Sequence, residues 1–215
     1  MDAPIDDEII ESFKVLTQQD VENDPSWKTA PIAVTSNDER HALNLMILQN
    51  FAFERNLPIL KWSKDISIKN NGVLEGILHD EHPELTGYFV QGAPSILLDN
   101  LNPTSGLANG TPSFMHSLAF ESEEQRQQVQ NLISNTQSGE IVDIPIPYAI
   151  IITLPSIDRQ KWKHESLDED NVTIPLLYKS HQKNTIECGE QKVSYKSHMV
   201  KLSLTINSKD KLFKK

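Results

Sequence analysis

The residues best suited to bind an anion lie where a short apolar run gives way to a polar loop. Pro31-Ile32-Ala33-Val34 is followed by Thr35, Ser36 and Asn37, and then by Arg40. Hydroxyl, amide and guanidinium donors beside a helix N-terminus can hold a phosphate, because the first backbone N–H groups of a helix have no partner within it. The same residue types also cap helices, so an anion site and a simple cap both fit this segment.

A second candidate site is the cation–aromatic pair Lys61-Trp62, which follows Ile59-Leu60. An indole ring can stack on an unpaired base while a neighbouring ammonium group neutralises a phosphate. Together with the residues from Thr35 to Arg40, this pair predicts weak binding of single-stranded DNA. About two or three phosphate contacts are expected, and so a shallow salt dependence.

Several other chemistries find little support in the sequence. None of the eight glycines precedes a lysine, so the Gly-x4-Gly-Lys loop that cradles nucleotide phosphates is missing. No Gly-x-Ser-x-Gly elbow frames a serine. His79 and His82 have no third ligand close in sequence, and a solvent-exposed loop is the preferred interpretation there. The single cysteine, Cys188, excludes an internal disulfide and a cysteine-based zinc site.

The charge of the chain argues against tight binding to nucleic acid. The net charge is −10, and residues 1–40 hold ten Asp and Glu against three Lys and Arg. Residues 201–215 carry five lysines and one aspartate. Any affinity for phosphate must therefore come from local donors. No apolar run approaches the roughly 20 residues that cross a bilayer, and the acidic start is unlike a targeting peptide. We expect an intracellular protein, in the nucleus or mitochondrion, with no membrane contact.

The elements that position the first candidate site are a strand, a helix and a second strand. Asn37 is the predicted N-cap, and apolar residues with the 3.6-residue period continue to Phe51. Asn56 suits a left-handed helix end and Pro58 prevents continuation, so the next strand covers 59–62. Strand, helix and strand in about 30 residues predict a βαβ unit of a parallel sheet.

The rest of the chain is predicted to be mainly β-structure after an irregular segment. Residues 63–87 lack a clear period, whereas from Tyr88 onward strands are predicted, with a helix that begins at a capping box of Ser122 and Gln125. The predicted strands cover residues 88–90, 95–98, 114–118, 141–154, 172–178 and 193–206. Near the N-terminus, residues 6–16 have the spacing of a short amphipathic helix, and Thr17 with Asp20 could cap a further turn.

Turn residues separate these strands. Gly92, Asn100, Asn109 and Gly110 are predicted at turns or strand edges, and Asn109-Gly110 is a strong hairpin signal because both residues accept a positive φ. Turn geometry alone is the preferred interpretation of these four residues, and a motif at the edge of a barrel is the alternative.

Two stretches resemble a known family. Residues 24–40 read Asp-Pro-Ser-Trp-Lys-Thr-Ala-Pro-Ile-Ala-Val-Thr-Ser-Asn-Asp-Glu-Arg, and residues 92–103 read Gly-Ala-Pro-Ser-Ile-Leu-Leu-Asp-Asn-Leu-Asn-Pro before Gly-Leu-Ala-Asn-Gly-Thr at 106–111. In this order they resemble PIF-type superfamily 1 DNA helicases, over about residues 20–120. The resemblance implies an α/β chain: a partial RecA-like lobe (1–87), a small antiparallel β-barrel with a short inserted helix (88–200) and a basic tail (201–215).

The same resemblance implies the expected function. It identifies a piece of an ATP-dependent DNA helicase, an enzyme class that serves DNA repair, and it implies that ATP and magnesium bind only in a complete helicase. After Ile206 the sequence departs from the family's His-Lys-x-Gln-Gly loop, so this chain is either a truncated product or one that diverged after losing the motor. The alternatives are a non-enzymatic protein-interaction or regulatory module, and pairing with a separate protein that supplies the missing motor lobe.

Overall fold

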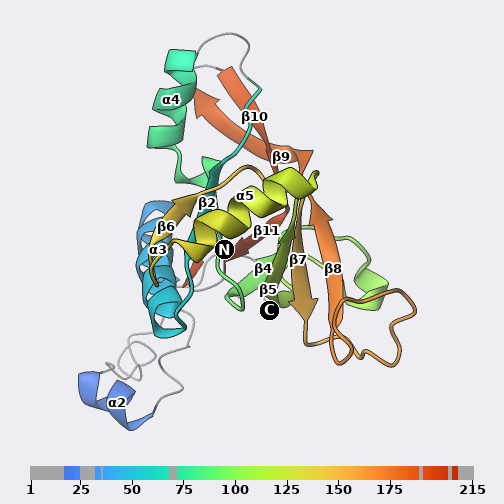
Figure 1. The fold of residues 1–215 in the computed structure, drawn as a ribbon. Helices are drawn as coiled ribbons and strands as arrows, with labels where there is room; N and C mark the ends of the chain where they lie inside the picture. The colour runs from blue at the N-terminus through green and yellow to red at the C-terminus, as the bar shows by residue number, and fades with distance from the viewer. Residues whose placement is uncertain are drawn as a thin grey trace, which may run out of the picture. The chain divides into compact units, whose positions relative to one another are not determined.

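The computed structural model describes residues 17–24, 32–34, 36–67, 72–188, 191–202 and 205–207. It divides into two compact units, Met1–Pro31 and Ile32–Lys215 (Figure 1). In the first unit, helix α2 (Gln18–Asn23) begins after Thr17, whose hydroxyl accepts a hydrogen bond from the Asp20 backbone. The Asp20 carboxylate accepts one from the Thr17 backbone in return, which confirms the predicted cap. The helix predicted over residues 6–16 lies outside the described residues.

The second unit begins with the predicted strand, helix and strand. These are β1 (Ile32–Val34), α3 (Asn37–Glu54) and β2 (Ile59–Ser63). The N-cap of α3 is Ser36 and not Asn37, because Ser36 forms a reciprocal capping box with Glu39. Asn56 lies just beyond the helix with φ 55°, the left-handed conformation that its position predicts.

Strand β2 is the centre of a three-stranded mixed sheet. It pairs antiparallel with β3 (Thr86–Phe89) and parallel with β6 (Ile141–Asp143). Strand β1 instead pairs in parallel with β12 (Thr205–Asn207). The strand–helix–strand order is thus present, but β1 and β2 share no ladder among the described residues.

The largest sheet is antiparallel, as the β-rich pattern after Tyr88 predicts. Its strands follow the order β11-β4-β5-β7-β8. They are β4 (Pro94–Leu97), β5 (Pro112–Ala119), β7 (Ala149–Leu154), β8 (Val172–Leu177) and β11 (Val200–Leu202). The predicted strand over residues 141–154 is in fact two, β6 and β7, which belong to different sheets. Pro145 and Pro147 lie between them and cannot donate to a ladder.

Two elements lie where the sequence predicted none. Helix α4 (Gly72–Glu81) falls in the segment expected to be irregular, and strand β9 (Lys179–Cys188) pairs with β10 (Gln191–Ser197). Both contribute to a small hydrophobic cluster of their own, which contains Leu78 of α4, Ile186 of β9 and Val193 of β10. Figure 1 shows α4 beside these two strands. Two glycines weaken the helix signal of α4, so packing and not propensity makes this segment helical.

The remaining helix and turns complete the fold. Helix α5 (Glu123–Ser134) begins at Ser122, whose hydroxyl accepts from the Gln125 backbone, and it buries Val129 in the main core. Two short 3-10 turns are η2 (Pro83–Leu85) and η3 (Pro103–Ser105). None of the helices in the described ranges is both long and apolar enough to span a bilayer.

One main hydrophobic core joins the two predicted domains. Leu48 of α3, Ile59 of β2 and Ile152 of β7 are fully buried members of the same cluster. The boundaries expected at 87/88 and 200/201 fall within β3 and β11, so the strand ladders do not follow them. The observed fold class is mixed α/β.

Candidate functional site

A cavity of about 230 Å³ lies between helix α3 and the sheets. Its walls come from the first turns of α3, from β2 and β3, and from the segment 195–201. The polar and titratable lining residues, besides Trp62, are Arg40, His41, Asn44, Lys64, Glu84, Thr86, Tyr88, Asn184, Tyr195, Ser197, His198 and Lys201. Among the described lining residues, Arg40 and Lys201 are cations and Lys64 is mostly charged near pH 7, whereas Glu84 is the single carboxylate. In a chain with a net charge of −10, this local excess of positive charge favours an anionic ligand.

Arg40 is the cavity residue contributed by the predicted helix-start motif. It is the fourth residue of α3, and its Nη2 lies 3.4 Å from Nε2 of His41. A guanidinium group can only donate, so the His41 Nε2 is the acceptor in this contact. The hydroxyl of Ser36 is engaged in the helix cap, which fits the capping interpretation. The side chain of Asn37 and all of Thr35 lie outside the described residues.

Strand alternation separates Lys61 from Trp62. Neighbouring residues of a strand point to opposite faces, and the Lys61 Nζ lies 3.0 Å from Oδ1 of Asp143, away from the cavity. Trp62 is only 2% exposed and lines the cavity. The two side chains therefore do not form the joint stacking surface that their adjacency suggested. DNA contact by either residue stays a prediction.

The indole ring of Trp62 lies directly over Gly87. The two residues are cross-strand partners in β2 and β3, and a Cβ atom at Gly87 would overlap the ring. Among the described residues, the buried Trp62 Nε1 has no hydrogen-bond partner. A buried N–H without an acceptor is costly, so a ligand or water oxygen near this point of the cavity wall would satisfy it.

Lys64 shares the cavity side of β2 with Trp62, two positions further on. Its Nζ donates to the backbone oxygen of Glu84 at 2.7 Å and lies 5.5 Å from the centre of the Tyr195 ring. Burial lowers the pKa of the Lys64 ammonium to about 8, although the Glu84 carboxylate partly opposes this shift. Near pH 7 most Lys64 side chains are charged, and a substantial minority are neutral amines.

His198 forms a neutral part of the wall. It is 3% exposed, its Nε2 donates to the Pro147 carbonyl at 2.9 Å, and its ring meets Trp62 edge-on with centroids 5.6 Å apart. Burial lowers the pKa of His198 to about 4; the hydrogen bond to Pro147 opposes the shift, and the nearby Lys64 charge adds to it. The positive charge of the cavity therefore comes from Arg40, Lys64 and Lys201.

The predicted turn residues lie outside the cavity lining. Gly92 has φ 76°, and its N–H donates to the carbonyl of Met115. The Asn100 side chain accepts from the Asn109 backbone at 2.9 Å, and Gly110 has φ 92°. Asn109 keeps a negative φ, so the turn is not the double left-handed type that Asn-Gly signals most strongly. These contacts hold the connection between β4 and β5.

The predicted exposed loop around His79 and His82 has a different structure. His79 is in the last turn of α4, and the His82 Nδ1 lies 3.4 Å from Oε1 of Glu84. In the part of the chain that the structure describes, no three His, Cys, Asp or Glu side chains are grouped to hold a metal.

Of the predicted site residues, only Arg40 and Trp62 line the cavity. Among the residues that sequence reasoning missed are Lys64, Tyr195, His198 and Lys201. Lys64 had a usable signal, since period-2 alternation along β2 places it on the same face as Trp62. Tyr195, His198 and Lys201 lie more than 130 positions after Lys64 in the sequence. No local pattern predicts contacts between residues so far apart in the chain.

No protein-family model matches this chain, and no curated protein sequence matches it. Solved structures of similar fold do exist. The Pif1 helicase from Candida albicans is similar with a TM-score of 0.42 and 8% identity, covering 90% of this chain and 41% of that one. Bacteroides Pif1 bound to single-stranded DNA is similar with a TM-score of 0.41 and 12% identity, covering 82% and 30%. The similarity thus extends over most of this chain, which spans less than half of either helicase.

Proposed function

We propose that this chain is a helicase-derived module that binds single-stranded DNA weakly through the cavity beside α3. The observation that carries the proposal is the grouping of Arg40, Lys64 and Lys201 around one cavity in an otherwise acidic protein. The helicase origin is supported by the two stretches that resemble PIF-type enzymes. On the same ground we propose that residues 1–87 derive from a RecA-like lobe and that residues 88–200 derive from a small β-barrel.

The cavity residues have complementary tasks in this proposal. The planar guanidinium of Arg40 can bind two oxygens of one phosphate, while Lys64 and Lys201 supply point charges. The unsatisfied Trp62 Nε1 can donate to an oxygen of the phosphate or of a base edge. Three cations neutralise few phosphates, so the affinity is low. The log of the affinity should fall with log salt with a slope of about −2.

ATP hydrolysis is not part of the proposed function of this chain alone. A loop of the Gly-x4-Gly-Lys type is needed to hold the nucleotide phosphates, and the sequence has none. ATP and magnesium would enter only if a separate chain supplied the motor lobe.

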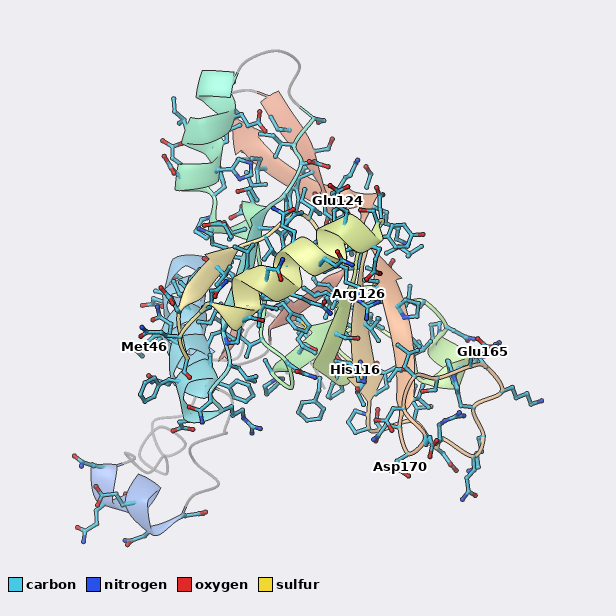
Figure 2. All side chains as sticks on the ribbon, viewed as in Figure 1. Met46, His116, Glu124, Arg126, Glu165 and Asp170 are labelled. Atoms are coloured by element: carbon cyan, nitrogen blue, oxygen red, sulfur yellow. The ribbon has the colours of Figure 1, made fainter. Side chains whose placement is uncertain are left out.

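The proposal is tested by fluorescence anisotropy with a labelled oligothymidylate over a salt series. The variant is Arg40→Ala, and its matched control is Arg126→Ala, because Arg126 is also the fourth residue of its helix, α5 (Figure 2). Arg126 is exposed, pairs with Glu123 and does not line the cavity. We expect Arg40→Ala to weaken binding by about tenfold, the worth of one charge-assisted phosphate contact. Arg126→Ala should bind like the unmodified chain.

Two outcomes would contradict the proposal. Absence of binding even at low salt would favour the alternative of a protein-interaction module. Equal effects of the two substitutions would show that DNA binds elsewhere on the surface.

A further inference from the structure

Lys64 differs in its surroundings from three other lysines of the described residues. Lys61, Lys161 and Lys196 each lie within 3.5 Å of an aspartate oxygen. The Lys64 Nζ has a backbone carbonyl as its hydrogen-bond acceptor and an aromatic ring beside it, and no carboxylate oxygen of a described residue lies within ion-pair distance. Burying an ammonium group without a counter-ion is costly, so a structural role alone does not explain this lysine.

The surroundings of Lys64 increase the share of the neutral amine, which is the nucleophilic form of lysine. Burial is the main cause of the low pKa of about 8, compared with the ordinary value near 10.5. The titratable groups that face Lys64 or share its cavity are Glu84, Tyr195, His198, Arg40, His41 and Lys201. Only Glu84 is a carboxylate among them, and its charge partly opposes the effect of burial. Arg40 and Lys201 line the same cavity and can hold an anionic ligand in it.

We propose that Lys64 is an imine-forming residue whose amine condenses with an aldehyde that lies next to a phosphate group. In the first step the neutral Nζ attacks the aldehyde carbon, and a proton moves from nitrogen to oxygen to give a carbinolamine. Loss of water from this adduct gives the imine, so one amine and one aldehyde yield one imine and one water, without any redox change. Arg40 and Lys201 hold the phosphate, and the cavity volume of about 230 Å³ accommodates one sugar phosphate.

The aldehyde next to a phosphate could come from either of two sources. One is an abasic site in single-stranded DNA, where the ring-opened sugar exposes an aldehyde between two phosphates; this source rests on the proposed function. The other is a free phosphorylated aldehyde, for which DNA binding is not required. The amine chemistry is common to both.

The reactivity of Lys64 is tested with pyridoxal 5′-phosphate as the probe. The unmodified chain is incubated with the probe near pH 8, reduced with borohydride and analysed by peptide mass spectrometry. Lys61 and Lys196 serve as internal controls in the same sample. We expect Lys64 to be labelled faster than either by on the order of tenfold, because Arg40 and Lys201 hold the phosphate of the probe beside an amine whose pKa is lowered by burial. Pyridoxal, which lacks the phosphate, should lose most of this preference, as should the Arg40→Ala variant.

The source of the aldehyde is tested with an oligonucleotide that holds one abasic site, trapped with borohydride and separated on a denaturing gel. A strand with a tetrahydrofuran analogue, which has no aldehyde, is the control. A covalent complex that is lost in Lys64→Arg supports the DNA source. Labelling by pyridoxal phosphate without this complex supports the free aldehyde. If Lys64 is labelled no faster than Lys61 and Lys196, the proposal is overturned, even where the anisotropy experiment shows DNA binding.

Discussion

Three residues of β2 and its extension show how strongly the surroundings of a side chain decide its role. Lys61 is solvent-accessible and paired with Asp143, so its contribution to stability is small. Trp62 is buried and rigid, and its ring forms part of the cavity wall. Lys64 faces the same cavity and holds its charge against the cost of burial. Lys61 and Lys64 are only three positions apart, yet the charge of Lys61 is exposed and paired, whereas the charge of Lys64 is opposed by burial.

The burial of a neutral His198 in the cavity wall can be tested by measuring how the free energy of unfolding depends on pH. Its folded-state pKa of about 4 is below the ordinary value of 6.5, so the unfolded chain binds a proton that the folded chain does not. The stability that this neutral histidine contributes is complete above pH 6.5 and is lost as the pH falls towards 4. Between neutral pH and pH 4 we expect a loss of about 3 kcal/mol from this group.

The measurement is urea unfolding at pH 7, 5.5 and 4 for the unmodified chain and for His198→Gln. The glutamine amide can still donate to the Pro147 carbonyl but cannot titrate. The variant should lose less stability on acidification than the unmodified chain. Parallel curves for the two proteins would show that His198 is protonated alike in both states.

At the scale of elements, the pairing of β2 with β3 fixes the cavity wall. The register places Gly87 opposite Trp62, and the missing side chain leaves room for the indole ring. Helix α3 covers the other side, and Leu48 packs into the same core as Trp62. A glycine inside a strand normally weakens it, so its presence here has a packing reason.

Substitution of Gly87 tests this packing. Gly87→Ala should lower the free energy of unfolding by about 1–3 kcal/mol, since the indole ring must move within a filled core. The matched control is Gly76→Ala in α4, where a Cβ atom meets nothing within 4 Å. That substitution should leave stability unchanged or raise it by about 0.5–1 kcal/mol, because alanine favours a helix. Denaturant unfolding of both variants measures the difference; equal losses would refute the role given to Gly87.

At the scale of the whole molecule, local signals predicted the elements better than their assembly. The period of α3, the left-handed Asn56 and the antiparallel strands after Tyr88 follow from short patterns that the structure bears out. Helix α4 escaped prediction because long-range packing of Leu78 stabilises it. The cavity was predicted only in part: Arg40 and Trp62 come from separate motifs, while Tyr195 and His198 reach it from the distant C-terminal strands.

The net charge of the whole chain does not predict the electrostatic potential in the cavity. Acidic residues concentrate in the first 40 positions, whereas the cavity holds three cations and one carboxylate. At ordinary salt, screening limits the range of interactions between exposed charges to about 8–10 Å. The charged groups beside a ligand therefore affect its binding more than the net charge of the chain does.

The most direct test of the central claim follows the Trp62 indole N–H by two-dimensional ¹H–¹⁵N NMR during titration with an oligothymidylate. The chain has three tryptophans, Trp27, Trp62 and Trp162, and substituting Trp27 or Trp162 with phenylalanine assigns their signals. Trp162 also has a buried Nε1 without a partner in the described residues but does not line the cavity, so it serves as the reference. We predict a progressive shift of the Trp62 signal that Arg40→Ala abolishes. A Trp62 signal that stays in place while the DNA binds would contradict the assignment of the cavity as the DNA site.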